Sequence, residues 1–453
     1  MGALPDGRAR GLADPRPSAV TAALRSRLIS MDNTFDVIVV GAGASGLAAA
    51  VEAARAGASV LALEKNHVPG RKILSTGAGK CNFSNRKVKP AAYHGAPAAF
   101  LRETFAALPP AAVLSFFEGL GLLWTEGEDG KLFPRSMRAQ DVVGVLMNEL
   151  VSRAVPVRTL MEAVSVKPSG CGFEVEAQRV PPQWEKKGPR GEKTSLRAAR
   201  VVLAAGGPCY PQIGGTSGGY ELLRRLGHTV TPLSPAIAPL KARCERIKEL
   251  DGVRLQAALT LLAEGRRPAR SEGELLFTDY GVSGPAALDL SREALAALKA
   301  GPVSLAADLF PDYSPGEMSA LLRGRAAAFA GRPFSHFACG LHNEKLLKVC
   351  AARCGIGWQA PAPQAAEGKL DALASLLKAF TLELTGTLGF EDAMVTAGGC
   401  PVSEVDPVSF ASKKVPGLFV TGELVDADGD SGGYNLHLAW TSGILAGRAA
   451  ARK

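Results

Sequence analysis

The sequence contains no paired cysteines and no long hydrophobic run, and it has few aromatic residues. Its 453 residues include 8 scattered cysteines and 6% aromatic residues. No two cysteines are spaced as Cys-x-x-Cys, which argues against a redox-active dithiol, a zinc ribbon and the disulfide framework of a secreted domain. No apolar run reaches the roughly 20 residues that span a membrane. We therefore expect reduced cysteines, no membrane partner and a cytoplasmic protein.

The net charge of the chain is also modest. The 52 lysines and arginines exceed the 43 aspartates and glutamates, which gives a formal net charge of +9. This modest excess permits an anionic partner, such as nucleic acid or a phosphorylated cofactor, but does not require one. A hydrophobic fraction of 47% is typical of a globular protein, and the length of the chain predicts more than one domain.

Two regions have some features of metal sites but lack others. Asp426, Asp428 and Asp430 alternate as in a calcium loop, yet the twelfth position counted from Asp426 is His437 rather than glutamate. Three cysteines lie between residues 339 and 354, and we interpret them as buried structural thiols. We therefore expect no metal site.

The clearest motif is G-x-G-x-x-G at Gly41, Gly43 and Gly46. An apolar, β-branched run over residues 35–40 precedes it, an alanine-rich helix follows it, and Glu64 ends the next strand. In such a βαβ unit the glycines permit a tight turn and close approach of a pyrophosphate to the backbone and the helix N-terminus. The acidic residue accepts hydrogen bonds from ribose hydroxyls and disfavours a 2′-phosphate. This context predicts a dinucleotide site.

The C-terminal part of the chain favours FAD over NAD in that site. The segment LFVTGE reads as a strand that ends in Gly422 and Glu423, where an acid could hold the ribityl chain of a flavin. A helix then starts at Gly433, and its free N–H groups could stabilise negative charge on the flavin ring. The sequence contains no second dinucleotide motif, so a layout with two nucleotide-binding domains is not expected.

The loop GRKILSTGAGKCNFSN, residues 70–85, resembles a phosphate loop at first sight. In the G-x-x-x-x-G-K-[ST] pattern, however, Leu74 stands where the first glycine belongs, and Cys81 stands where a hydroxyl should bind magnesium. We interpret the loop as a second FAD-contacting segment. Cys81 is our candidate catalytic acid, because the neighbouring Lys80 should lower the pKa of its thiol. Simple packing under the flavin is an equally open role for this cysteine.

The order of the predicted elements indicates a discontinuous nucleotide-binding domain. We expect a disordered tail or start-site extension over residues 1–33, since Met31 directly precedes the first strand. The nucleotide-binding domain is predicted to occupy residues 34–232 and 382–453. An insert with strands and helices is predicted between them, over residues 233–381.

Several further strings complete the pattern, namely GGPCYPQIGGTSGGYELLRRLGH, GELLFTDYGVSGPAALDLS, VTAGGCPVSEVDP and DADGDSGGYNLHLAWTSG. Together with the two loops above, they resemble the BaiN/RdsA-like (YhiN-like) family of NAD(P)/FAD-dependent oxidoreductases. The sequence departs from the family pattern at a few positions, which leaves the substrate open: Lys80 replaces Arg, Gly219 Asp, Asp279 His, Cys400 an aliphatic residue and His437 Gln.

The resemblance implies an α/β fold. A Rossmann-like, glutathione-reductase-type FAD-binding domain would be interrupted by a β-barrel-like subdomain over residues 233–310 and a helical one over 311–381. It also implies NADH or NADPH as transient electron donor and reduction of a conjugated carbon–carbon double bond, in ribosomal RNA uridine or in a small enone. A flavin amine oxidase and a non-enzymatic flavin-binding redox sensor are the alternatives.

The candidate site residues come from both parts of the predicted FAD-binding domain. Cys81 is the catalytic candidate. We expect the cofactor to contact Gly41, Gly43, Ala44, Ser45, Gly46, Glu64, Lys65, Arg71, Lys72, Gly79, Asn82, Gly206, Gly422, Glu423, Gly433, Tyr434 and Asn435.

Overall fold

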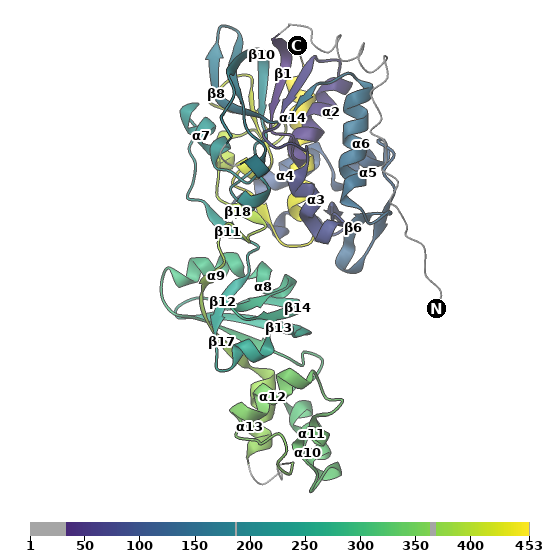
Figure 1. The fold of residues 1–453 in the computed structure, drawn as a ribbon, viewed down its shortest axis with the longest axis vertical. Coiled ribbons are helices and arrows are strands. Elements are labelled where there is room, and N and C mark those ends of the chain that lie inside the picture. Colours follow the sequence, from purple (N-terminus) through teal and green to yellow (C-terminus); the bar gives the residue numbers. More distant parts are fainter. Residues whose placement is uncertain (1–32, 186–187, 363–367, 453) are drawn as a thin grey trace, which may run out of the picture.

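The computed structural model describes residues 33–185, 188–362 and 368–452. The tail predicted for residues 1–33 lies outside the described residues, apart from Asn33. Figure 1 shows an elongated molecule in which a sheet with flanking helices lies above a barrel, and the barrel lies above a small group of helices. This order matches the two subdomains of the insert that the family resemblance implies.

A seven-stranded sheet forms the centre of the larger part. Its strand order is β7-β2-β1-β10-β9-β8, and β19 also pairs with β10. β1 is parallel to β2 and β10, and β10 is parallel to β19, whereas β9 is antiparallel to β10. The bounds of these strands are Thr34–Val40 (β1), Val60–Leu63 (β2), Val157–Arg158 (β7), Met161–Ser169 (β8), Gly172–Arg179 (β9), Lys193–Leu203 (β10) and Leu418–Val420 (β19).

The parallel strands have the burial expected of a sheet that is covered on both faces. Four successive residues, Val37 to Val40, are buried in β1, and all of β2 is buried. The surrounding helices are α2 (Ala44–Arg55), α3 (Arg71–Ser75), α4 (Ala98–Ala107), α5 (Pro110–Glu118), α6 (Ala139–Ser152), α7 (Gly218–Arg225) and α14 (Tyr434–Ala450). The first and the last of them, α2 and α14, pack directly against each other although they lie at opposite ends of the chain.

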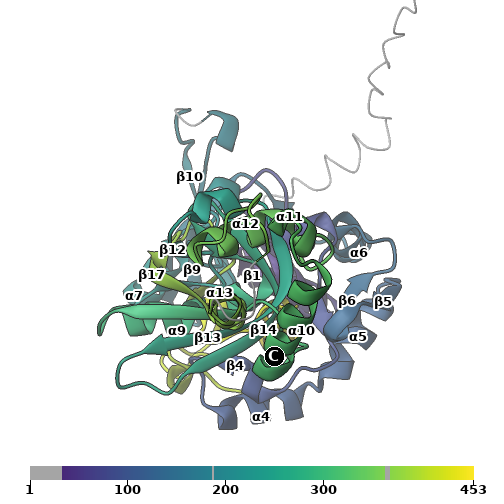
Figure 2. The ribbon, with the colours of Figure 1, turned by 90° about the horizontal axis from the view of Figure 1, so that it is seen from below.

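Two small sheets are separate from the central sheet. One consists of β3 (Ser84–Asn85), β6 (Lys131–Pro134) and β5 (Trp124–Glu126), and the other of β4 (Tyr93–His94) and β20 (Asp428–Gly429). The hairpin between β9 and β10 projects away from the body of the molecule (Figure 2).

The insert begins and ends at a two-stranded link. The chain leaves the larger part at β11 (Ser234–Ala236) and returns at β18 (Val395–Ala397), and these strands pair antiparallel. Between them lies a closed barrel of order β12-β15-β14-β13-β16-β17. Its strands are Leu240–Arg243 (β12), Arg254–Ala263 (β13), Ala269–Thr278 (β14), Gly281–Ser283 (β15), Val303–Asp308 (β16) and Phe380–Thr387 (β17), with helices Pro285–Asp289 (α8) and Ser291–Leu298 (α9).

The strand β17 corrects the predicted boundary at 381/382, which falls inside this strand. Residues Phe380 to Glu383 alternate buried and exposed, as in a strand with one face toward the core of a barrel. The strand pairs with β12 and β16, so it closes the barrel instead of starting the C-terminal part of the FAD-binding domain. The sequence analysis predicted no strand here, and the strands with which it pairs lie far earlier in the chain.

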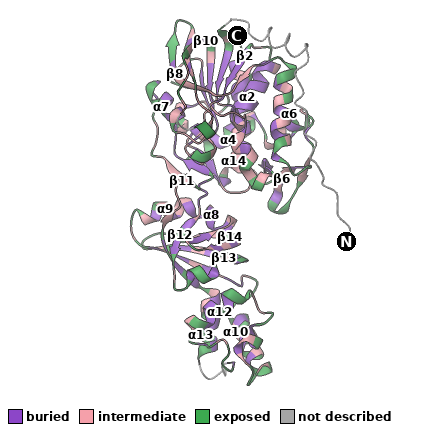
Figure 3. Cartoon of the chain, viewed as in Figure 1, coloured by how far each residue is buried: buried purple, intermediate pink, exposed green. Residues whose placement is uncertain are grey.

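The helical subdomain carries α10 (Pro315–Ala328), α11 (Phe334–Ala338), α12 (Glu344–Arg353) and α13 (Lys369–Lys378). Ser314 begins α10 with a capping box, in which its side chain accepts from the amide of Glu317. The barrel and these helices share one hydrophobic core, separate from the core of the larger part. Buried residues accordingly lie in the interior of each part (Figure 3).

Candidate functional site

A cavity of about 540 Å³ opens at the carboxyl ends of the parallel strands. Val40, Leu63 and Ala204, at or directly after the ends of β1, β2 and β10, lie in its wall, as do Gly422 and Glu423 after β19. The cavity also reaches Ile237 and Met394, beside the link to the barrel. Open α/β sheets bind their ligands at this edge, and the volume is ordinary for a small-molecule site.

The glycine turn after β1 brings backbone, rather than side chains, to the cavity. A Cβ on Gly41 would lie 2.4 Å from the carbonyl oxygen of Ala204, and a Cβ on Gly46 would lie 1.9 Å from the carbonyl oxygen of Gly41. Gly43, in contrast, faces open space. Two glycines thus hold the turn against the neighbouring strand and helix, and the third leaves room for a ligand at the N-terminus of α2.

Glu64 accepts a hydrogen bond from the glycine turn and also lines the cavity. Its Oε2 accepts from the amide of Ala42 at 2.9 Å, and its Oε1 accepts from the backbone amide and the side-chain amide of Asn66, both at 2.8 Å. Oε1 thus already accepts two hydrogen bonds but Oε2 accepts one, so the buried Glu64 can still accept from a ribose hydroxyl at Oε2.

Lys72 and Glu423 form an ion pair across the cavity wall. Lys72 Nζ lies 2.6 Å from Glu423 Oε2, while Glu423 Oε1 accepts from the amide of Thr396 at 2.7 Å. Burial by itself would lower the pKa of Lys72, but the adjacent Glu423 carboxylate raises it, so this lysine stays charged. The pKa of Lys65, in the same wall, is lowered, mainly by burial.

The start of α14 faces the other end of the cavity. Gly433 precedes the helix with φ +99°, and a Cβ there would lie 2.5 Å from the carbonyl oxygen of Ser84. Asn435 Oδ1 accepts from the amide of Gly429, and its Nδ2 donates to the carbonyl of the same residue. Asn82 Oδ1 accepts from the amide of Leu132 at 3.1 Å. This geometry leaves the first N–H groups of a helix beside the cavity.

Acidic residues gather where the cavity meets the barrel. Asp428 and Asp430 line it, and Asp430 Oδ1 lies 2.8 Å from His94 Nε2. The hydrogen bond to Asp430 is the main cause that raises the pKa of His94. Arg292 of the barrel helix α9 pairs with Asp428, and Asp289, at the end of α8, accepts from the amide of Ser431 at 2.7 Å. Burial raises the pKa of Asp289 to about 6.

Most of the predicted cofactor residues lie in the cavity wall. Gly46, Gly79 and Tyr434 do not, and Gly46 instead packs against Gly41. The residues in the wall are Gly41, Gly43, Ala44, Ser45, Glu64, Lys65, Arg71, Lys72, Asn82, Gly206, Gly422, Glu423, Gly433 and Asn435. Their contacts with a cofactor remain predictions.

The environment of Cys81 corrects the expectation of an acidified thiol. The residue is fully buried, it lies outside the cavity wall, and its φ is +58°. Burial raises the pKa of the thiol to about 12, against the smaller opposite effect of a hydrogen bond with Thr76. Lys80 lines the cavity instead of acidifying its neighbour. Of the two roles that the sequence left open, this geometry favours packing.

Sequence reasoning missed several polar contributors to the cavity. Thr396, Asp430 and Lys131 line it, although none was a candidate. Thr396 and Asp430 lie in strings that carried the family resemblance, VTAGGCPVSEVDP and DADGDSGGYNLHLAWTSG. Those strings were therefore the available signal, but they assigned no role to single residues.

The part of the chain that the structure describes contains no helix with the length and hydropathy of a membrane span.

Comparison with known proteins identifies the family. The family model described as "HI0933-like protein Rossmann domain" matches residues 35–449. The chain is 33% identical to the 3-dehydro-bile acid delta(4,6)-reductase of Clostridium scindens, over 92% of this chain and 98% of that protein. It is 30% identical to the ribosomal RNA dihydrouridine synthase of Escherichia coli, over 90% of this chain and 96% of that protein.

A solved structure supports the fold. The 3-ketosteroid delta1-dehydrogenase of Sterolibacterium denitrificans superposes with a TM-score of 0.52 at 15% identity, over 92% of this chain and 99% of that chain. At this identity the likeness concerns the fold alone. The match of the family model and the two relatives of nearly the same length carry the assignment. The chain therefore belongs to the HI0933-like family of FAD-dependent oxidoreductases.

Proposed function

We propose that the protein binds FAD in the cavity and, with NADH or NADPH as electron donor, reduces a carbon–carbon double bond conjugated to a carbonyl group. The observation that carries the proposal is the composition of one cavity, with a dinucleotide turn at one end and titratable groups at the other. The two relatives are named for reductions of this kind, of a bile acid and of uridine in ribosomal RNA.

The residues present fit FAD. The open space at Gly43 and the N-terminus of α2 suit a pyrophosphate, and Glu64 suits a ribose. Glu423 lines the cavity and would accept from the ribityl hydroxyls, and the start of α14 would face the flavin ring. When bound, FAD supplies the hydride transfer from the electron donor to the substrate.

The reaction also needs a proton for the second carbon of the double bond, and the chain offers one beside the cavity. Asp430 lines the cavity, and its partner His94 reaches solvent with 32% of its side chain exposed. Because the pKa of His94 is raised by this pair, its imidazolium persists closer to neutral pH than that of a free histidine. His94 and Asp430 could therefore pass a proton from solvent to the cavity wall.

The deciding experiment follows the absorbance of the purified protein without oxygen. We expect about one FAD per chain, loss of the flavin absorbance on addition of NADH or NADPH, and its return when a conjugated enone or a uridine-containing rRNA fragment is added. A colourless protein that takes up no FAD would contradict cofactor binding. A flavin that is reoxidised by oxygen but by no unsaturated acceptor would contradict the reductase activity.

The same assay separates the substrate classes. Reoxidation by a 3-oxo-4-ene steroid would indicate a small enone, whereas reoxidation by rRNA that weakens steeply with salt would indicate RNA. Steady peroxide formation with an amine would instead indicate an amine oxidase, which neither relative resembles by name. A protein whose flavin is reduced but never turns over would fit a redox sensor.

A further inference from the structure

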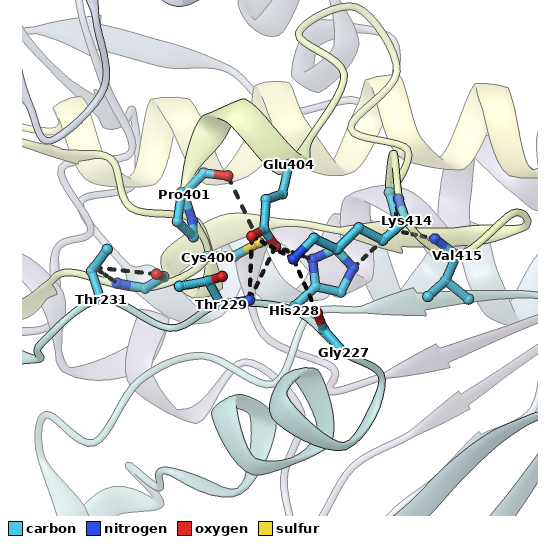
Figure 4. A network of polar contacts seen from close by, with 11 residues as sticks. Gly227, His228, Thr229, Thr231, Cys400, Pro401, Glu404, Lys414 and Val415 are labelled. Carbon is cyan, nitrogen blue, oxygen red and sulfur yellow. Dashed lines mark hydrogen bonds and ion pairs between the residues drawn. The ribbon is translucent and has the colours of Figure 1, made fainter.

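Three side chains with metal-binding atoms meet away from the cavity. His228 follows α7, while Cys400 and Glu404 follow β18, so the cluster joins segments more than 170 residues apart. One ligand atom from each, namely the imidazole Nδ1, the thiol Sγ and a carboxylate oxygen, lie within 4.8 Å of one another. Figure 4 shows the three side chains converging between these segments. His228 and Cys400 are buried, and the side chain of Glu404 is only 13% exposed.

The distances within the cluster are close to those of a metal centre. Cys400 Sγ lies 3.5 Å from His228 Nδ1, and the same nitrogen lies 2.8 Å from Glu404 Oε2. A tetrahedral zinc ion, with bonds of about 2.3 Å to sulfur and about 2.0 Å to nitrogen, holds these two ligand atoms about 3.5 Å apart. The sulfur and nitrogen are thus already in place, and only the carboxylate would need to move outward slightly.

A second layer of contacts orients the histidine and the carboxylate. His228 Nε2, the ring nitrogen on the far side, lies 2.8 Å from Ser412 Oγ. Glu404 Oε1, the oxygen that faces away from the cluster, accepts from Lys414 Nζ at 2.6 Å, and Oε2 accepts from the amide of Thr229 at 3.1 Å. Histidines and carboxylates that bind metals usually have such outer partners, which fix the ring and the carboxylate.

The local charge also favours a cation. Glu404 and Asp426 together outweigh the positive charge of Lys414, and Asp426 adjoins the cluster because its amide donates to the carbonyl of Cys400 at 2.8 Å. Within the described parts of the chain, Asp426 Oδ1 is buried without a hydrogen-bond partner. A divalent ion bound together with the thiolate of Cys400 would make the sum of these charges zero.

From this geometry we propose that His228, Cys400 and Glu404 bind one transition-metal dication, of the zinc class, with water as the fourth ligand. Nitrogen, sulfur and carboxylate ligands in a tetrahedral arrangement select zinc over magnesium or calcium. The ion would link the turn after α7 to the segment 399–405, within the FAD-binding part of the protein. It takes no part in the proposed redox reaction.

Binding requires a change of protonation that can be measured. The Cys400 thiol is buried, and a thiol binds a metal ion as the thiolate. Coordination replaces the thiol proton and moves the imidazole proton from Nδ1 to Nε2. About one proton should therefore leave for each ion that binds.

The test uses full-length FAD-loaded protein with any affinity tag removed, treated with chelator and then titrated with Zn²⁺ or Co²⁺. We expect one Zn²⁺ per chain by elemental analysis, and one proton released by calorimetry in buffers of different ionisation heat. Bound Co²⁺ should give tetrahedral d–d absorption at wavelengths beyond the flavin bands. A wild-type chain with no bound ion and no such bands would overturn the proposal, and would show that hydrogen bonds alone hold the cluster.

Matched variants localise the ion. Cys400→Ala and Glu404→Gln should weaken Zn²⁺ binding by roughly tenfold or more. Cys354→Ala, in the helical subdomain, should leave the affinity unchanged. Zn²⁺ should raise the melting temperature of the wild type and of Cys354→Ala but not of Cys400→Ala. Equal affinity in wild type and Cys400→Ala would place the ion elsewhere and refute the site. Because these readouts are independent of turnover, they stand whether or not the proposed reaction is observed.

Discussion

The FAD-binding part and the insert are packed in different ways. In the FAD-binding part, backbone meets backbone, because a Cβ on Gly443 of α14 would lie 2.2 Å from the carbonyl oxygen of Ser45 in α2. In the insert, side chains fill the space, as where Phe277 and Phe380 meet with ring centroids 5.7 Å apart inside the barrel. Gly324, in the insert helix α10, has open space around it.

The difference follows from what each part must present. The cavity needs exposed backbone amides at the starts of α2 and α14, and these helices can lie close together only when small residues face each other. The insert encloses no part of the dinucleotide turn, so ordinary apolar side chains suffice for its core. Four experiments test this difference in packing and function, and the first should have the strongest effect.

The largest effect is expected from adding one methyl group between α2 and α14. Gly443→Ala should destabilise the protein by about 2 kcal/mol or more, because the new Cβ overlaps the backbone of α2. Gly324→Ala is the matched control and should stabilise the protein by about 0.5–1 kcal/mol, since alanine favours a helix and meets no atom there. Melting temperature and FAD retention measure both effects. If alanine is tolerated equally at positions 443 and 324, the proposed difference in packing between the two parts is wrong.

The second experiment removes a charge from the cavity wall. Glu423→Gln keeps the acceptor for the amide of Thr396 but loses the ion pair with Lys72 and the proposed contact with the ribityl chain. We expect FAD affinity to fall about tenfold, the size of one charged hydrogen bond. Glu383→Gln on the exposed face of β17 should leave it unchanged. Flavin fluorescence on release measures the affinity, and unchanged binding in Glu423→Gln would count against this cofactor placement.

The third experiment concerns the pH profile. His94 has a raised pKa, so its proton-donating form is complete at low pH and is lost as pH rises through that raised value. Turnover should decline over the same range, and the small stabilisation from its pair with Asp430 should fade with it. In His94→Gln this dependence should disappear and the rate should fall several-fold, whereas His336→Gln in the insert should match wild type. An unaltered profile in His94→Gln would exclude this proton route.

The smallest effect is expected at Cys81. Because the thiol is buried outside the cavity and its pKa is about 12, Cys81→Ala should retain FAD and turn over within about twofold of the wild-type rate. Cys350→Ala, which removes a buried thiol from the insert, should behave alike. A large loss of turnover with FAD still bound would restore the catalytic role for Cys81.

The nucleotide-binding unit can be predicted from local sequence. Gly41, Gly43, Gly46 and Glu64 lie within 24 residues of one another, and turn, helix and strand preferences act over that range. The family strings then implied the barrel and helices of the insert, and both are present. The boundary at 381/382 was misplaced, because it falls inside β17, whose partners are distant barrel strands.

Features that combine distant segments arise only in the folded chain. Lys72 meets Glu423 from 351 residues away, and His228 meets Cys400 from 172 residues away, distances over which no local pattern carries information. It also reversed the expected acidity of Cys81, since a neighbouring lysine in sequence says nothing about desolvation. Charges and thiols take their properties from their surroundings, and those surroundings exist only once the chain has folded.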